Sequence, residues 1–279
     1  MAKIKKHKGK IPNLTTDEMI EVDRLMMEEY HIELIQMMEN AGRCLAILAN
    51  QVFIKKHIKK KTVIVLAGTG GNGGGAMVCA RRLHSWGAKV KVFITAEADK
   101  MTPIPAHQLR ILKRIGIPIS NGKNISAEES ADLIIDGIIG YSIKGDPYGV
   151  PKEMIDWANK QNAPVLALDT PSGLGLTTGK VHKPTIQATA TMTLALPKQG
   201  LFEIEAAKVI GDLYLGDISV PPSLYAEESL KMKVSKTLFA KSDIILVKKK
   251  AEPKKKTKNK KSEKSKKSKN IKKSKKKKK

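Results

Sequence analysis

The order of apolar and polar residues changes its period along the chain, and each period predicts a different element. Near the start, Met19, Val22 and Met26 recur at helical spacing, directly after Thr15–Glu18, which matches a capping box. A second run of apolar residues at helical spacing extends from Leu34 to Leu48. We therefore predict two amphipathic helices here, each with one apolar face.

The period then changes to short unbroken apolar runs, which are typical of strands buried on both faces of a parallel sheet. The first run, Thr62–Ala67, ends in the glycine-rich turn Gly68–Gly75, and a helical pattern follows until Gly87. Further strands are predicted at Val90–Ile94, Leu133–Asp136, Val165–Asp169, Thr191–Leu196 and Leu213–Val220. Helical stretches separate most of these strands, so the pattern predicts an α/β fold with a mostly parallel sheet covered on both faces.

Charge is distributed unevenly along the chain. The formal net charge is +25, but residues 248–279 hold twenty Lys and two Glu, and residues 1–12 hold five Lys and no acid. These two segments carry +18 and +5, which leaves +2 for residues 13–247. We predict a basic N-terminal arm over 1–12 and a folded domain over 13–225. The extension over 226–247 forms either a last helix or a last strand, and the lysine-rich tail over 248–279 is disordered because like charges repel.

The lysine-rich tail has two interpretations. One is that it binds RNA, DNA or another acidic surface through the release of counterions, without sequence preference. The other is that it only keeps the chain soluble and has no specific partner. The charge pattern is compatible with both.

The two cysteines, Cys44 and Cys79, fall in apolar helical patterns and belong to no CxxC motif or His/Cys cluster. This pattern excludes a disulfide framework, does not favour a structural zinc site, and predicts a reducing, cytoplasmic location. The basic start of the chain has no apolar segment behind it, so a secretory signal is not expected. Because no apolar run reaches the length of a membrane span, we expect a soluble protein with no membrane partner.

Three predicted strands end in glycine or polar residues, and the carboxyl ends of parallel strands are where such folds bind ligands. The first of these ends, Gly68-x-Gly70-x-x-Gly73, matches the dinucleotide fingerprint between a strand and a helix. Its backbone N–H groups could approach a phosphate at the start of the helix. The next strand lacks the acidic residue at its end that a dinucleotide site normally has, which weakens the match to the fingerprint. No Gly-Lys-Ser/Thr follows the turn, so it is not a P-loop. We favour a ligand-binding turn over a purely structural one.

The other two strand ends each deliver a carboxylate. Asp136 closes one apolar run and leads into Gly140–Asp146, where it either caps a turn or contacts a cation or substrate; both interpretations stay open. Asp169 closes the next run and is followed by Ser172, whose oxygens could join an oxygen-liganded cation site. We expect Asp169 to be the acid–base group, since a partly desolvated carboxylate suits proton transfer.

Five segments in the same order resemble motifs of one family. They are Thr15–Asp23, Met37–Gly42, the glycine turn with Val78–Arg81 behind it, Asp169–Gly173 and Thr193–Leu201. Over residues 13–225 the chain resembles the NAD(P)H-hydrate epimerase family, also known as the YjeF N-terminal domain. The resemblance implies a Rossmann-like three-layer αβα sandwich, usually dimeric. It also implies an enzyme that interconverts the R and S forms of hydrated NADH and NADPH at the hydroxylated ring carbon.

The resemblance also implies site residues. A potassium ion would be held by Asn72, Asp136 and Ser172, and Asp169 would carry the proton transfer. Hydrated NADH or NADPH would contact Gly71, Asn72, Gly73, Gly74, Gly75, Gly140, Tyr141, Ser142, Ile143, Lys144, Gly145, Asp146 and Asp169.

The chain departs from the family pattern at three glycines. Gly71 stands where the family has Asn, Gly75 stands where it has Asp, and Gly175 stands where an Asp often follows. These changes leave an alternative open. In that alternative, the same fold is a weak or inactive enzyme that binds a nucleotide or RNA, with the lysine-rich tail contacting nucleic acid.

Overall fold

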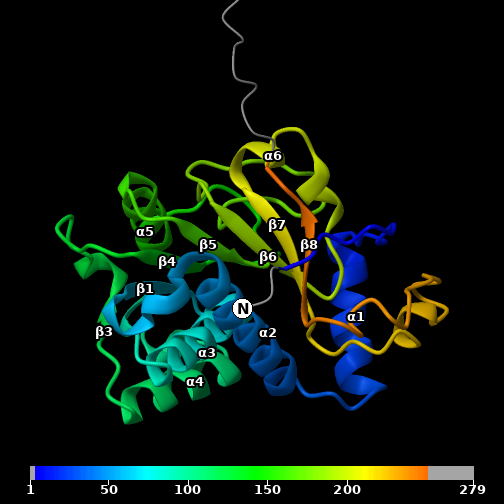
Figure 1. The fold of residues 1–279 in the computed structure, drawn as a ribbon, viewed down its shortest axis with the longest axis horizontal. Helices are drawn as coiled ribbons and strands as arrows, with labels where there is room; N and C mark the ends of the chain where they lie inside the picture. Colours follow the sequence, from blue (N-terminus) through cyan, green and yellow to red (C-terminus); the bar gives the residue numbers. More distant parts are fainter. Residues whose placement is uncertain (1–3, 251–279) are drawn as a thin grey trace, which may run out of the picture.

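The computed structural model describes residues 4–250, and within them one sheet of eight strands organises the chain (Figure 1). The strands are β1 Thr62–Ala67, β2 Lys89–Ile94, β3 Ile119–Asn121, β4 Leu133–Gly137, β5 Val165–Leu168, β6 Ala190–Leu194, β7 Asp212–Gly216 and β8 Ile244–Lys248. Their order is β3-β2-β1-β4-β5-β6-β7-β8, and each pair is parallel apart from β7 and β8, which are antiparallel.

Helices cover both faces of the sheet. They are α1 Thr16–Glu28, α2 Leu34–Ala49, α3 Gly71–Ser85, α4 Pro103–Arg114, α5 Gly149–Lys160 and α6 Ala206–Val209. Helices α2, α3 and α4 share one apolar cluster with alternate strand residues such as Val65 and Ile135. Helix α5 packs against the residues between them, such as Ile64 and Ile134, and α6 packs against Leu213 on that same face. The predicted three-layer α/β sandwich with a mostly parallel sheet is therefore confirmed.

Helix α1 lies beyond the carboxyl ends of the strands, where Figure 1 shows it at the side of the molecule near β8. Its buried residues Met19, Val22 and Met26 pack with Ala195 and Ile218, which follow β6 and β7. The predicted capping box is present, because Thr15 accepts from the Glu18 amide and Glu18 from the Thr15 amide. This position lets α1 contribute side chains to the edge where ligands bind.

The glycine-rich turn differs from its predicted form. We predicted a turn through Gly75 followed by a helix, but α3 begins at Gly71, so the last five glycine-turn residues form its first turns. The glycines allow the helix to start against the strands: a Cβ on Gly73 would lie 2.0 Å from the Gly68 carbonyl oxygen. Glycine has a low helix propensity, so the sequence did not predict that the helix begins here. Close packing against the strands favours the helix.

The predicted strands also ended too late at three places. Leu213–Val220 stops at Gly216, where β7 ends. Val165–Asp169 stops at Leu168, and Thr191–Leu196 stops at Leu194, because Asp169 and Ala195 turn out of the sheet with φ angles of 62° and 58°. Both values fall in the left-handed region, which side-chain-bearing residues rarely occupy. These two turns shape the carboxyl edge of the sheet.

The ends of the described chain meet at β8. We left 226–247 open as a last helix or a last strand, and a strand forms there that continues one residue into the predicted tail, to Lys248. The His7 amide donates to the Leu246 carbonyl at 2.9 Å, and the Leu246 amide donates to the Lys5 carbonyl at 3.1 Å. The predictions for residues 1–3 of the arm and 251–279 of the tail lie outside the described residues. Over residues 4–250, we find no helix with the length and apolar character that crossing a bilayer requires.

Candidate functional site

Asp169 stands at the point where β5 leaves the sheet. Its φ of 62° is left-handed, and its amide donates to the Met192 carbonyl of β6 at 2.7 Å. Asp tolerates this conformation better than bulkier residues, but it still stores strain, and such strain concentrates at functional sites. The turn directs the carboxylate along the carboxyl edge, toward the loop after β6.

The carboxylate of Asp169 is anchored through one of its two oxygens. Oδ1 accepts from the Thr193 hydroxyl at 3.0 Å, the Leu194 amide at 3.2 Å and the Lys198 ammonium at 2.5 Å. The side chain of Lys198 is fully buried and that of Asp169 is 4% exposed, so this is an interior ion pair. Among residues 4–250, Oδ2 accepts no hydrogen bond and remains available to a substrate hydroxyl.

A second carboxylate approaches from α1. Asp23 accepts a hydrogen bond from the Tyr141 hydroxyl at 2.9 Å. Burial raises the pKa of Asp23, while the hydrogen bond from Tyr141 and the charge of Lys198 oppose that rise. Burial and the Asp23 charge together raise the pKa of the Tyr141 hydroxyl above its ordinary value. The Tyr141 hydroxyl therefore keeps its proton and donates a hydrogen bond to the Asp23 carboxylate.

These groups line one cavity of about 90 Å³ at the carboxyl edge. Its walls are Met19, Asp23, Leu34, Met37, Met38, Ala41, Gly71, Asn72, Tyr141, Leu168, Asp169, Leu194, Lys198 and Ile218. Most of the apolar wall comes from α1 and α2. The polar groups come from α1 (Asp23), from the start of α3 (Asn72) and from the loops after β4, β5 and β6 (Tyr141, Asp169 and Lys198). An apolar wall with a few converging polar groups is the usual form of a small-molecule site.

The predicted cation ligands lie close beside this cavity. Asp136 is fully buried, and its carboxylate accepts from the Ser172 hydroxyl at 2.5 Å and the Ser172 amide at 2.8 Å. Burial raises the pKa of Asp136 to about 6 although these hydrogen bonds lower it. Asn72 donates to the Leu168 carbonyl at 2.8 Å, with its side-chain amide packed against Gly140. A carboxylate, a hydroxyl and an amide oxygen form a donor set that fits a hard cation.

The structure brings only part of the predicted substrate set to the cavity. Gly71, Asn72, Tyr141 and Asp169 line it. Gly73, Gly74 and Gly75 are buried in α3, and Gly140 lies against Asn72. Ser142, Ile143, Lys144, Gly145 and Asp146 do not belong to its walls.

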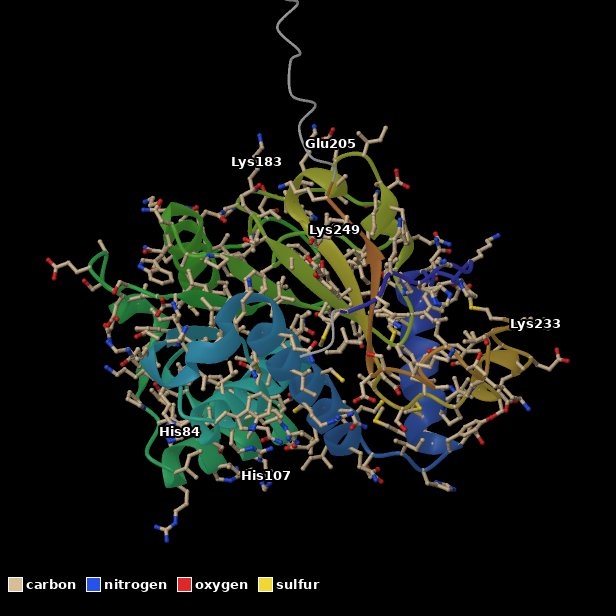
Figure 2. All side chains as sticks on the ribbon, in the orientation of Figure 1. His84, His107, Lys183, Glu205, Lys233 and Lys249 are labelled. Carbon is tan, nitrogen blue, oxygen red and sulfur yellow. The ribbon has the colours of Figure 1, made fainter. Side chains whose placement is uncertain are left out.

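The end of the 140–146 loop is held elsewhere. Asp146 contacts the His182 ring at 3.1 Å and accepts from the Lys183 amide at 3.1 Å, while its side chain stays 65% exposed. Figure 2 shows Lys183 at the molecular surface, and His84 and His107 on the outside of α3 and α4. Asp146 and the residues around it could contact only a part of a ligand that extends out of the cavity.

Sequence reasoning missed two members of the site, Asp23 and Lys198. Both stand inside segments that had been recognised as family-like, Thr15–Asp23 and Thr193–Leu201, but neither received a role. The signal for Lys198 was a lysine within an otherwise apolar and small-residue run, since a lysine is rarely buried without a partner. Asp23 carried no such signal, because one acid on an amphipathic helix is ordinary.

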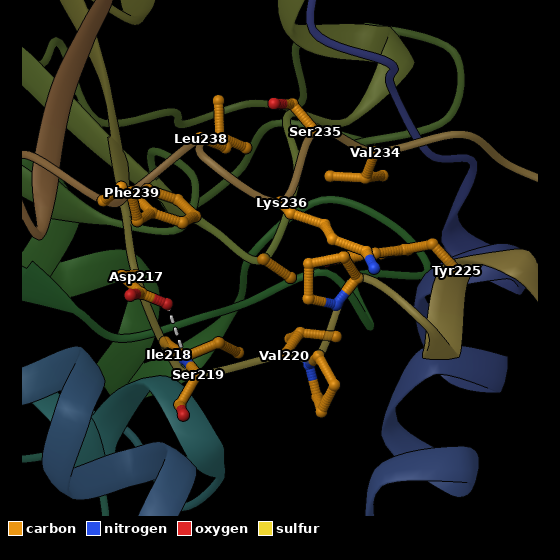
Figure 3. A pocket seen from close by; sticks show the side chains of 14 residues that line it. Asp217, Ile218, Ser219, Val220, Tyr225, Val234, Ser235, Lys236, Leu238 and Phe239 are labelled. Carbon is orange, nitrogen blue, oxygen red and sulfur yellow. Dashed lines mark hydrogen bonds between the residues drawn. The ribbon is translucent and has the colours of Figure 1, made fainter.

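A larger cavity of about 380 Å³ adjoins the first and shares Ile218 with it. Figure 3 shows it between the residues after β7, such as Asp217 and Val220, and a segment that includes Val234 and Phe239. It holds no charged pair comparable to the one at Asp169, so the smaller cavity is the candidate site.

The chain is similar in sequence to known proteins over most of its length. The NAD(P)H-hydrate epimerase of Dehalogenimonas lykanthroporepellens is 36% identical over 79% of this chain and 87% of its own length. The NAD(P)H-hydrate epimerase of Rhodopirellula baltica is 32% identical over 79% of this chain and 89% of its own. The bifunctional NAD(P)H-hydrate repair enzyme Nnr of Moorella thermoacetica is 33% identical, and the match spans only 45% of that longer protein.

A solved structure supports the fold. The crystal structure of yeast ynu0 superposes with a TM-score of 0.69 at 22% identity, covering 85% of this chain and all of the yeast one. The family model described as YjeF-related protein N-terminus matches residues 34–200, which include the glycine turn, Asp136, Asp169 and Lys198. The resemblance predicted from the motifs is confirmed, and the chain belongs to the YjeF-related protein N-terminus family.

Proposed function

We propose that this chain is an epimerase that interconverts the R and S forms of hydrated NADH and NADPH. The observation that carries the proposal is the Asp169 carboxylate, which is held by Lys198 through one oxygen and offers the other to a small buried cavity. The relatives named NAD(P)H-hydrate epimerase match most of this chain and support the same reaction. The cavity of about 90 Å³ suits a single ring of the substrate rather than the whole dinucleotide.

The reacting carbon of the substrate is a hemiaminal, and two routes can invert it. In the first, Asp169 takes the hydroxyl proton, the carbon–nitrogen bond breaks to give an aldehyde, and the ring nitrogen takes a proton from water. The aldehyde then rotates, and the nitrogen attacks its other face. Ring closure returns the nitrogen proton to water, and Asp169 returns its proton to the new hydroxyl. In the second, the protonated hydroxyl leaves as water, and another water adds to the opposite face and gives its proton to the carboxylate. Both routes require one acid–base group beside the hydroxyl.

Lys198 and Tyr141 have positioning roles in this proposal. The Lys198 ammonium fixes the Asp169 carboxylate in place and balances its charge in the interior. The Tyr141 hydroxyl, bound to Asp23, stands on the same cavity and can donate a hydrogen bond to the carboxamide or hydroxyl of the ring. A carboxylate fixed in a cavity with an apolar wall needs little rearrangement during proton transfer.

The start of α3 suits the phosphates of the substrate. Gly71, Asn72 and Gly73 present the first amides of this helix, which have no helical acceptor, and the Gly74 amide is the first to donate within it, to the Gly70 carbonyl. The positive end of the helix dipole favours an anion there. Because Gly71 and Asn72 also line the cavity, a pyrophosphate at this point would leave the ring close to Asp169.

A potassium ion is also proposed, with Asn72, Asp136 and Ser172 as its ligands. Their oxygen donor set suits a hard cation, and the buried carboxylate of Asp136 has no charged partner among the described residues. When bound, the ion would supply a positive charge beside the phosphate-binding helix start. We expect potassium chloride, compared with choline chloride, to raise the melting temperature, and Asp136→Asn to remove that difference.

Two further expectations concern assembly and location. A homodimer is proposed, supported by exposed Ile20 and Met27, which lie two turns apart on one side of α1. A cytoplasmic location is proposed, supported by Cys44 and Cys79, which are free and buried. Light scattering of the purified chain with Ile20→Glu tests the dimer.

The direct test follows the equilibration of separated R and S forms of hydrated NADH in potassium buffer. We expect the purified chain to accelerate it and Asp169→Asn to reduce the rate at least about a hundredfold, the usual size of an acid–base contribution. Asp156→Asn, an exposed carboxylate on α5 paired with Lys152, is the matched control and should retain the rate. If the original chain gives only the spontaneous rate, the proposal fails and a non-catalytic binding module of the same fold is the better description.

A further inference from the structure

The larger cavity beside the candidate site has the size and the walls of a ligand site. Its volume of about 380 Å³ falls within the range of small-molecule sites, whereas the cavity at Asp169 measures about 90 Å³. Pro221, Pro222 and Phe239 supply flat apolar surfaces. Figure 3 shows Phe239 on one side of this space and Tyr225 on the other. Walls of this kind suit a planar aromatic ring.

A buried hydroxyl without a partner belongs to the same cavity. Tyr225 lines the cavity and is 2% exposed, yet its hydroxyl has no hydrogen-bond partner among residues 4–250. Buried polar groups in folded proteins are nearly always hydrogen-bonded, so this hydroxyl calls for an acceptor. Figure 3 shows Tyr225 and Lys236 reaching into the cavity from opposite sides. A ring nitrogen of a bound ligand would supply the acceptor.

The second polar group is the half-buried carboxylate of Asp217. Its Oδ1 accepts from the Ser219 amide at 2.7 Å, while Oδ2 accepts no hydrogen bond within the described part of the chain. Burial raises the pKa of Asp217, and the hydrogen bond from Ser219 opposes that rise. A further N–H donor at Oδ2 would therefore stabilise the carboxylate.

Backbone strain marks the cavity as well. Ala195 and Ser219 line it, and both have left-handed φ angles, 58° and 71°. Residues other than glycine rarely adopt this conformation, and strain of this kind concentrates at functional sites. Ala195 directly follows Leu194, whose amide donates to Asp169 at 3.2 Å. The larger cavity is therefore built against the wall of the candidate active site.

We propose that the larger cavity binds an aminopurine base of the adenine type, carried by a nucleoside or nucleotide that is separate from the substrate. The ring would lie against the apolar walls. Its amino group would donate to Oδ2 of Asp217, and a ring nitrogen would accept from the Tyr225 hydroxyl. An aromatic ring without these two groups would leave the buried carboxylate and the buried hydroxyl unpaired, which costs affinity.

The order of the strands separates this ligand from the hydrated dinucleotide. The start of α3, proposed for the pyrophosphate, follows β1, while Asp169 follows β5 and Asp217 follows β7. In the order β1-β4-β5-β6-β7, Asp169 therefore lies between the other two. A dinucleotide with its reacting ring at Asp169 and its phosphates at α3 extends away from the larger cavity. This separation rests on the proposed function, whereas the base site itself does not.

The test titrates the full chain with adenosine, without hydrated NADH present, and compares inosine, which has a carbonyl oxygen in place of the amino group. We expect adenosine to bind about tenfold or more tightly, because inosine loses the hydrogen bond to the Asp217 carboxylate. Tyr225→Phe should weaken adenosine binding about fivefold. The same substitution at Tyr148, which is 84% exposed and lines neither cavity, is the matched control and should leave the affinity unchanged.

Asp217→Asn should reverse the preference between the two nucleosides. Asn keeps an oxygen for the Ser219 amide and presents an N–H group in place of Oδ2, so inosine should then bind more tightly than adenosine. Absent adenosine binding, or equal affinity of the original chain for both nucleosides, would overturn the base site.

A second titration at saturating hydrated NADH tests whether the ligand is separate. Adenosine should not be displaced; displacement would overturn the separate ligand and assign the cavity to the adenosine half of the substrate. A chain that binds adenosine in this way and fails to accelerate epimerisation would refute the proposed function alone and leave the base site standing.

Discussion

The ammonium nitrogen of Lys198 lies 2.5 Å from Oδ1 of Asp169, although the two residues belong to loops after different strands. Lys198 is fully buried and also donates to the Leu194 carbonyl at 3.0 Å. A buried ion pair costs desolvation energy that its attraction only partly returns, so its retention here is better explained by function than by stability.

Removing one partner of this pair should therefore be costly, while removing both should not. We expect Lys198→Met to lower the free energy of unfolding by about 3 to 5 kcal/mol, because it leaves the Asp169 carboxylate buried without its cation. The double variant with Asp169→Asn should recover most of that loss. Urea unfolding of the two single variants and of the double variant gives the three free-energy changes of this double-mutant cycle. Additive losses would contradict a direct interaction.

The pKa of Asp23 predicts how the stability of one variant depends on pH. Burial raises this pKa above the ordinary value of 3.8, so the folded state favours the protonated carboxyl. The stabilisation from such a group is present below its unfolded pKa and is lost as the pH rises through its folded pKa. Asp23→Asn keeps an acceptor for the Tyr141 hydroxyl and has no charge to bury.

We therefore expect Asp23→Asn to gain unfolding free energy relative to the original chain as the pH rises from about 4 to about 7. Thermal or urea unfolding at several pH values measures this difference. Asp156→Asn, on the exposed side of α5, is the control, and its difference from the original chain should stay nearly constant. A constant difference for Asp23→Asn as well would show that Asp23 is not desolvated.

The two altered glycines of α3 should respond in opposite ways when the family residues are restored. A Cβ on Gly71 would meet no atom within 4 Å, so Gly71→Asn should keep or slightly raise the melting temperature. A Cβ on Gly75 would lie 2.7 Å from the Leu168 side chain, in a buried position. Gly75→Asp would place a charge there and should lower stability by several kcal/mol.

Gly75→Ala separates the steric part of this effect from the charge. It should cost less than Gly75→Asp, because the end of the Leu168 side chain can shift. Equal losses of stability for the two variants would mean that steric crowding alone causes the destabilisation. If Gly75→Asp is tolerated and raises epimerase activity, the position faces the substrate rather than the core.

Much of the fold followed from local pattern, because the parallel strands are buried on both faces and read as apolar runs. The capping box at Thr15 was equally local, since both of its hydrogen bonds join residues three apart. The start of α3 was hidden for the opposite reason. Glycines signal a turn, and only packing against the Gly68 carbonyl shows that they begin a helix.

The candidate site was only partly predictable, because its residues meet through tertiary structure. Asp169 could be placed at a strand end from the pattern, but its pairing with Lys198 bridges 29 residues. That pairing also depends on the left-handed turn at Ala195, which periodicity does not reveal. The contact between Tyr141 and Asp23 spans 118 residues and requires α1 to dock beyond the sheet edge.

Tyr225 and Tyr141 differ in whether the hydroxyl has a hydrogen-bond partner among the described residues. Tyr225 lines the larger cavity (Figure 3) and is 2% exposed, and its hydroxyl has no hydrogen-bond partner among residues 4–250. The Tyr141 hydroxyl, in contrast, donates to Asp23 at 2.9 Å. Removing a buried hydroxyl without a partner should release a desolvation cost, and removing a bonded one should lose a hydrogen bond.

We therefore expect Tyr225→Phe to raise the free energy of unfolding by about 1 kcal/mol and Tyr141→Phe to lower it by about 1 to 2 kcal/mol. Urea unfolding at neutral pH measures both changes. The substitution is chemically identical at the two positions, so a difference in sign reports the partner of each hydroxyl. A loss of stability for Tyr225→Phe would mean that its hydroxyl is satisfied in solution, by water that enters the larger cavity, because only a bonded hydroxyl is costly to remove.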